Sequence, residues 1–252
     1  MRTLFHNAFF LAACSLASMA AQAQFGPPPA QTPASARDAA PIDITGYWVA
    51  LVTEDWRFRM VVANAGDYEG IGLTARGREE ANAWDPDADI ASGNTCKAYG
   101  AGGLMRIPTR LHITWTGDNV LQIETDAGTQ TRLLKFGSAQ DNAGAGTLQG
   151  VTNARWLLER GSPFAPPTWG SIQAITTDMA PGYLRRNGVP YGTQARLTEH
   201  YELLVGGDGT EYLTVIGDLE DPEYLTQIYT ISTNFKREPD GSKWDPTACI
   251  VK

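Results

Sequence analysis

The chain has 252 residues, is 10% aromatic, and carries a formal net charge of −8 at pH 7. An acidic protein repels phosphate groups, so the composition argues against nucleic acid and anionic lipid surfaces as partners. After the N-terminal region no run of 18 apolar residues occurs, so no transmembrane helix is expected.

Residues 1–23 have the composition of a secretory signal peptide. Arg2 precedes an apolar run, and Ala21-Gln22-Ala23 matches a small-x-small cleavage site. In the alternative interpretation, Leu11-Ala12-Ala13-Cys14 is a lipobox and Cys14 carries a lipid anchor. Cleavage after Ala23 is favoured, because the apolar region before Cys14 is short. Both interpretations predict export: a periplasmic or secreted protein, or an outer-membrane lipoprotein.

Residues 24–41 are rich in Pro, Ala and Gln and lack large aliphatic side chains, which predicts a disordered tether. No second linker follows, so residues 42–252 are expected to form a single domain.

Apolar and polar residues alternate between turn signals along most of this domain. Segments with this pattern cover residues 44–60, 109–116, 120–125, 129–136, 150–158, 172–178, 194–205, 210–218 and 224–232. About nine strands at hairpin-like spacing favour an all-β fold, a closed antiparallel β-barrel, because closure removes exposed strand edges. One or two short helices, at residues 74–84 and 97–104, are inserted after the first strand and should cap or flank the barrel.

Gly46-Tyr47-Trp48, which opens the first strand, resembles the G-x-W signature of lipocalins and related calycin barrels. The resemblance implies a lipocalin-like barrel in which Trp48 closes the floor and is structural. The helical insertion and the ninth strand depart from that family. "LTEHYEL" at 197–203 and "DLEDPEYLTQIY" at 218–229 also resemble exported bacterial proteins of unassigned function, which supports the architecture and adds no activity.

Three charged residues, Glu54, Arg132 and Glu199, interrupt the apolar rows of the predicted strands. A buried carboxylate needs a partner, and Arg132 is the available cation. One interpretation is a structural ion cluster. The other is a set of polar anchors in an aromatic pocket, with the ligand-binding residues Glu54, Trp56, Arg132, Trp156, Glu199 and Tyr201.

Three functional hypotheses follow from this constellation. The first is an exported protein that binds a small, largely apolar molecule in a barrel cavity. The second is a cofactor-independent isomerase, lyase or hydrolase that uses Glu54 and Glu199 as catalytic acid and base in the same cavity. The third is a structural protein whose barrel is filled with side chains.

The remaining motifs concern crosslinks, metals and a loop. Cys96 and Cys249 predict one disulfide in an oxidising compartment. "DPDADIASG" at 85–93 resembles a calcium loop but has Ile90 in place of the required Gly, so no metal is expected. No nucleotide or dinucleotide motif occurs, and no cofactor is expected. Residues 180–192, stiffened by prolines, are either a lid over the barrel mouth or an ordered surface loop.

Overall fold

A computed structural model of the chain describes residues 35–137, 141–159 and 169–251. The predicted signal peptide, Cys14 and most of the predicted tether therefore lie outside the described residues. Within the described ranges, no helix is both long and apolar enough to cross a membrane.

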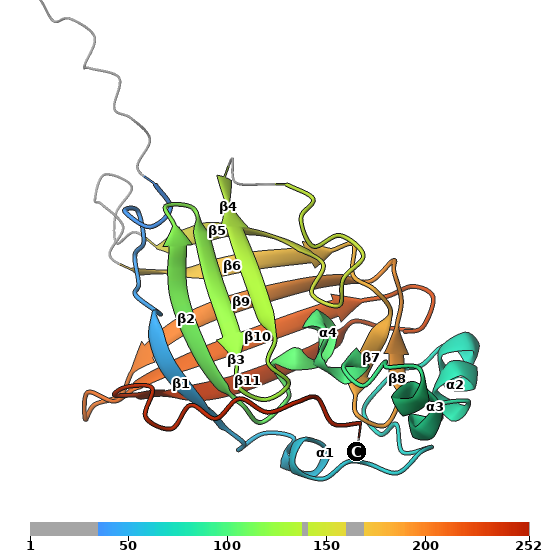
Figure 1. Ribbon diagram of the computed structural model, residues 1–252. Coiled ribbons are helices and arrows are strands. Elements are labelled where there is room, and N and C mark those ends of the chain that lie inside the picture. The colour runs from blue at the N-terminus through green and yellow to red at the C-terminus, as the bar shows by residue number, and fades with distance from the viewer. Residues whose placement is uncertain (1–34, 138–140, 160–168, 252) are drawn as a thin grey trace, which may run out of the picture. The chain divides into compact units, whose positions relative to one another are not determined.

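Nine strands form a closed barrel in the order β1-β11-β10-β9-β6-β5-β4-β3-β2 (Figure 1). They are β1 (Gly46–Leu51), β2 (Arg110–Gly117), β3 (Val120–Thr125), β4 (Thr131–Phe136), β5 (Val151–Glu159), β6 (Trp169–Thr177), β9 (Arg196–Val205), β10 (Glu211–Glu220) and β11 (Tyr229–Glu238). Strand β1 pairs with both β11 and β2, so the sheet has no free edge. The closed β-barrel and its nine strands are confirmed.

The expectation of an entirely antiparallel barrel is wrong at one pair. Strands β4 and β5 run parallel, with Leu134 opposite Thr152 and Phe136 opposite Ala154. A parallel pair needs a connection that returns the chain to the starting end of the sheet. Residues 137–150 separate β4 from β5, which is long enough for such a connection, and no local sequence signal reveals the parallel pairing.

The first strand is shorter than its alternating pattern predicts. It ends at Leu51, and residues 56–60 form the helix α1 (Trp56–Met60). Asp55, immediately before α1, has a φ of 49°, in the left-handed region, which breaks the extended strand. The side chains after Leu51 therefore do not continue the inward row of β1.

The insertion after the first strand contains more helices than expected. The predicted helix at 74–84 is confirmed as α2 (Ala75–Asn82), where the Thr74 hydroxyl accepts a hydrogen bond from the Gly77 amide at 3.0 Å. The second predicted helix consists of η1 (Lys97–Tyr99) and α4 (Ala101–Leu104). An unexpected helix, α3 (Pro86–Ala91), begins at the carboxylate of Asp85, which accepts from two amides of its first turn.

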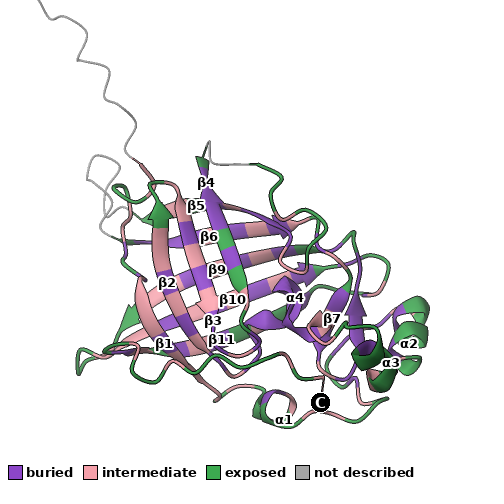
Figure 2. Cartoon of the chain, in the orientation of Figure 1, coloured by how far each residue is buried: buried purple, intermediate pink, exposed green. Residues whose placement is uncertain are grey.

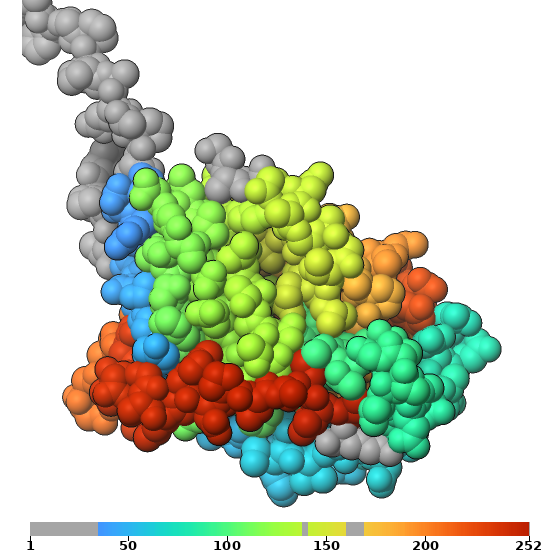
Figure 3. Space-filling model, in the orientation of Figure 1, coloured from blue at the N-terminus to red at the C-terminus, as the bar shows by residue number. Residues whose placement is uncertain are grey.

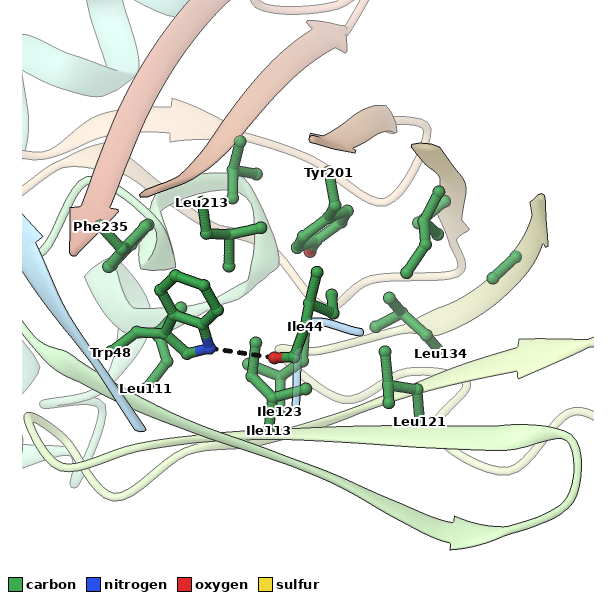
Figure 4. Packing of buried hydrophobic residues seen from close by; sticks show 14 of the residues in the cluster. Ile44, Trp48, Leu111, Ile113, Leu121, Ile123, Leu134, Tyr201, Leu213 and Phe235 are labelled. Atoms are coloured by element: carbon green, nitrogen blue, oxygen red, sulfur yellow. Dashed lines mark hydrogen bonds between the residues drawn. The ribbon is translucent and has the colours of Figure 1, made fainter. Parts of the chain in front are cut away.

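The interior of the barrel is filled by a large apolar cluster. Trp48 is fully buried in it, and its Nε1 donates a hydrogen bond to the Ile44 carbonyl at 2.9 Å (Figure 4). Buried residues alternate with partly buried ones along most of the barrel strands, as Figure 2 shows. The inward side chains are those of Ile44, Trp48, Leu111, Ile113, Leu121, Ile123, Leu134, Ile172, Tyr201, Leu213, Val215 and Phe235.

A second apolar cluster covers one end of the barrel. It joins α2 and α4 to the hairpin of β7 (Gly182–Arg185) and β8 (Val189–Tyr191), with Leu184 and Tyr191 almost completely buried. Residues 180–192 are therefore an ordered hairpin packed over the barrel end, which we call the cap, and a role as a lid stays a prediction.

The segment at residues 35–41 packs against the opposite end of the barrel. Trp156 Nε1 donates a hydrogen bond to the Ala36 carbonyl at 2.8 Å, and the Ala36 amide donates to Asn119 Oδ1 at 2.8 Å. Residues 35–41 therefore contact the barrel, and for the rest of residues 24–41 a tether stays a prediction.

Candidate functional site

Arg132 and Glu199 form an ion pair inside the barrel. Arg132 Nη1 and Nη2 donate to the two Glu199 oxygens at 2.9 and 2.5 Å. Their side chains are 0% and 2% exposed. Arg132 Nη2 also donates to the Thr176 hydroxyl at 3.1 Å, which lies 2.8 Å from the hydroxyl of Thr152. The pairing of Arg132 with Glu199 follows the sequence interpretation, while a ligand-binding role for either residue stays a prediction.

This pair forms a polar layer between the two apolar clusters. Along β9, Leu197 belongs to the cluster under the cap, Glu199 to the polar layer, and Tyr201 to the cluster inside the barrel. Both charged groups are thereby surrounded by packed side chains.

Burial and charge shift several pKa values in this layer. Burial opposes the charge of Arg132, but the adjacent Glu199 outweighs that effect and raises the pKa of the guanidinium. Burial, together with Glu199, raises the pKa of Tyr201, and burial raises the pKa of Tyr191 in the cap. The arginine therefore stays charged and both phenols stay neutral at physiological pH.

Glu54 and Trp56 lie outside the barrel, which corrects their expected position. The Glu54 carboxylate accepts hydrogen bonds from the backbone N–H of Asn234 at 3.2 Å and from the side-chain Nδ2 of the same residue at 3.4 Å. The Asn234 side chain is on the outer face of β11, because its neighbours Thr233 and Phe235 are the buried residues there. Trp56, in α1, is 60% exposed. Glu54 and Glu199 thus occupy opposite sides of the barrel wall, and the expected pair of carboxylates in one cavity is wrong.

Trp156 and Tyr201 are both part of the packed structure. Trp156 lies against Phe136 at the end covered by residues 35–41, with 5.2 Å between ring centroids. Tyr201 is fully buried, and its hydroxyl is 3.5 Å from Arg132 Nη1. The six residues expected to line one pocket therefore occupy three separate places. Glu54 and Trp56 lie outside the barrel, and Trp156 lies at the end covered by residues 35–41. Arg132, Glu199 and Tyr201 lie in or beside the polar layer.

A surface groove with a volume of about 380 Å³ lies beside α1 and the C-terminal segment, and we call it the α1 groove. Figure 3 shows the C-terminal segment, in red, between the barrel strands in blue and green and the region of α1 in cyan. The groove is lined by Arg59, Met60, Tyr99, Ile107, Pro108, Ala127, Arg186, Thr247, Ala248 and Ile250.

The C-terminal wall of the α1 groove is fixed by a disulfide and by backbone hydrogen bonds. Cys249 is bonded to Cys96 over a sequence separation of 153 residues, which confirms the predicted crosslink. The Thr247 amide donates to the Asp126 carbonyl at 2.9 Å, and the Ile250 amide donates to the Tyr99 hydroxyl at 3.2 Å.

Two arginines, Arg59 and Arg186, line the groove near α1, and a third, Arg106, contacts Arg59 through its backbone carbonyl. Arg59 is 2% exposed and pairs with Glu54 (Nη1–Oε1 2.7 Å), while Arg106 pairs with Asp55 (Nη2–Oδ2 2.6 Å). Arg59 Nε donates to the Arg106 carbonyl at 2.9 Å. Arg186, from the β7–β8 turn, approaches the Arg59 carbonyl at 3.4 Å.

After these contacts, Arg59 and Arg186 still lack some hydrogen-bond or salt-bridge partners among the described residues. Arg59 Nη2 is buried and has no hydrogen-bond partner among residues 35–137, 141–159 and 169–251. Within the same ranges, Arg186 forms no salt bridge. Burial and the repulsion of Arg106 lower the pKa of Arg59, although Glu54 counteracts both.

The acidic residue Asp89, in α3, has a structural role. Asp89 is buried and receives hydrogen bonds from Lys97 Nζ (3.0 Å), the Tyr183 hydroxyl (2.8 Å) and Trp84 Nε1 (3.0 Å). In the part of the chain that the structure describes, no group of three or more His, Cys, Asp or Glu side chains could hold a metal.

The sequence interpretation missed the α1 groove and its arginines. A signal exists in "WRFRM" at 56–60 and "LRR" at 184–186, where arginines gather in an otherwise acidic chain. The groove combines six separate segments, however, and spacing within one segment does not bring them together. No family profile, curated protein or solved structure matches this chain.

Proposed function

We propose that this protein is an exported, calycin-like binding protein for a small, largely apolar molecule, which it holds in the α1 groove. The barrel interior is occupied by its own large side chains, including Trp48, Tyr201 and Phe235, each fully buried. A filled interior is what the hypothesis of a side-chain-filled barrel requires, and it argues against the expected cavity, so a ligand would have to bind outside the barrel.

The observation that carries the proposal is the lining of the α1 groove. Met60, Ile107, Pro108 and Ile250 supply apolar walls, and Arg59 and Arg186 are the two charged residues of the lining. That combination, at about 380 Å³, is typical of small-molecule sites. Exposed Met60 and Ile250 are apolar surface that a ligand would cover.

Two further features support the calycin-like and exported parts of the proposal. The Trp48 ring is buried between the core and the Arg237 guanidinium, whose Cζ lies 4.2 Å from the ring centroid, as a structural role for the G-x-W tryptophan requires. The Cys96–Cys249 disulfide fits an oxidising compartment, periplasmic or extracellular.

The enzyme hypothesis has less support, because it needs Glu54 and Glu199 in one cavity. Glu54 bonds to the outer face of β11, and Glu199 is held by Arg132 inside the barrel. Nothing in this geometry lets the two carboxylates act on one substrate.

The test uses the neutral apolar fluorophore N-phenyl-1-naphthylamine, whose emission rises when it leaves water. Ile250→Glu places a charge in the α1 groove, and Ile228→Glu is the matched control, since the two side chains are similarly exposed, at 52% and 50%, and Ile228 does not line the groove. We expect fluorescence enhancement with the wild type and the control, and loss with Ile250→Glu. Equal enhancement in all three proteins, or none in the wild type, contradicts the proposal.

A further inference from the structure

We propose that the ligand of the α1 groove is a monocarboxylate with an apolar body, and that Arg59 and Arg186 bind its carboxylate. This inference rests on the proposed function and specifies the chemical class of the ligand. It follows from the balance of charge around the groove, the incomplete hydrogen bonding of Arg59, and the apolar character of the other walls.

The charge balance at this end of the groove favours one additional negative charge. Two arginines line the groove: Arg59 pairs with Glu54, and Arg186 forms no salt bridge with a described residue. One guanidinium therefore remains without a carboxylate partner among the residues that the structure describes. The excess of a single charge matches a monoanion, and the net charge of −8 over the whole chain disfavours a multiply charged ligand.

Arg59 has a nitrogen, Nη2, that could donate a hydrogen bond to such a monoanion. Its Nε and Nη1 are engaged by the Arg106 carbonyl and by Glu54, whereas Nη2 has no partner in the described ranges although it is buried. A buried donor on a charged group is strongly unfavourable when it is left unsatisfied. A carboxylate in the groove would accept first from Arg186, which lines it and is partly exposed, and would reach Arg59 Nη2 only after a small shift of the side chains that cover this atom.

The rest of the groove suits an apolar body attached to that carboxylate. Ile107, Pro108, Ala127 and Ile250 line it, so an alkyl chain or aromatic ring would bury apolar surface there. A bare inorganic anion would leave these walls uncovered. The ligand class is therefore an amphipathic acid.

The experiment compares four ligands of equal chain length by isothermal titration calorimetry: decanoate, 1-decanol, decylamine and decyl phosphate. We expect decanoate to bind about tenfold or more tightly than 1-decanol, as charge-assisted hydrogen bonds to buried arginine allow. Decylamine should bind most weakly, because the site is cationic.

Arg186→Gln is the discriminating variant, because Arg186 is only partly buried and its replacement leaves the ion pairs of Arg59 and Arg106 intact. Arg155→Gln, on the outer face of β5, is the control that removes the same charge elsewhere. We expect Arg186→Gln to reduce the preference for decanoate over 1-decanol, because only Arg59 then remains to bind the carboxylate, and Arg155→Gln to retain it; an unchanged preference in Arg186→Gln contradicts the inference.

The outcomes separate this inference from the proposed function. If decanoate and 1-decanol bind the wild type equally, the carboxylate site is wrong while the apolar groove stands. Tighter binding of decyl phosphate than of decanoate contradicts the assignment to monocarboxylates. If neither these four ligands nor N-phenyl-1-naphthylamine binds, both proposals fail.

Discussion

Both oxygens of Glu199 accept hydrogen bonds from Arg132, at 2.9 and 2.5 Å, in a layer closed to solvent on both sides. The barrel on one side and the cap on the other supply mainly apolar side chains. The charge of each residue is therefore compensated chiefly by the charge of the other. Removing one partner should leave the other buried and uncompensated.

We therefore predict that Arg132→Ala lowers the free energy of unfolding by about 3–5 kcal/mol. Urea denaturation followed by tryptophan fluorescence measures the change. Arg155→Ala, at an exposed position of β5, should change it by less than about 0.5 kcal/mol. Equal stability of the Arg132 variant and the wild type would show that removing Arg132 does not leave Glu199 buried and uncompensated.

A double replacement separates the cost of an unpaired charge from the value of the pair. Arg132→Met combined with Glu199→Leu removes both charges and preserves apolar volume, so it should be markedly more stable than either single variant. The measurement is a double-mutant cycle by urea denaturation. Additive effects of the two single replacements would contradict a direct coupling between these residues.

Glu54 should make stability depend on pH in the acidic range. Burial would raise its pKa, but the hydrogen bond from Thr53 and the charge of Arg59 prevail, and the pKa of Glu54 lies below its usual 4.5. A lowered pKa in the folded state stabilises the protein above pH 4.5, and this contribution is lost as the pH falls through the folded-state value. Glu54→Gln should therefore be less stable than wild type at pH 7.

The difference between Glu54→Gln and the wild type should shrink progressively below pH 4.5, as thermal unfolding at pH 7, 5 and 3 can measure. Glu202→Gln, on β9, serves as a control, because Glu202 forms no salt bridge with any described residue. A difference that stays constant from pH 7 to pH 3 would exclude a stabilising role for the Glu54 carboxylate.

The disulfide should affect both stability and the α1 groove. Replacing Cys96 and Cys249 by Ser opens a link across 153 residues, for which chain entropy predicts a loss of up to about 5 kcal/mol. Because Cys249 holds the C-terminal wall, the same variant should bind N-phenyl-1-naphthylamine more weakly. Unchanged binding in a folded double variant would show that the C-terminal segment is not part of the site.

The sequence predicted the features that depend on local pattern. Alternation revealed the barrel strands, Thr74 marked the start of α2, and the even cysteine count predicted the disulfide. The pairing of Arg132 with Glu199 followed from two opposite charges in apolar rows, because buried charges must be compensated.

Other features depend on tertiary contacts and were not predictable in this way. Residues 52–60 continue the alternation of β1, yet the left-handed backbone at Asp55 ends the strand and takes Glu54 and Trp56 out of the barrel. The parallel pairing of β4 with β5 leaves no local trace. The α1 groove combines residues as distant as Arg59 and Ile250, which no single segment brings together.

The most direct test of the binding site is a methyl NMR titration with N-phenyl-1-naphthylamine, using protein labelled at the isoleucine δ1 methyl groups. Ile107 and Ile250 line the α1 groove, whereas Ile113 and Ile123 lie in the barrel core. We predict saturable chemical-shift changes at Ile107 and Ile250, with Ile113 and Ile123 unchanged. Changes concentrated at Ile113 and Ile123 would place the ligand inside the barrel and contradict the α1 groove as the site.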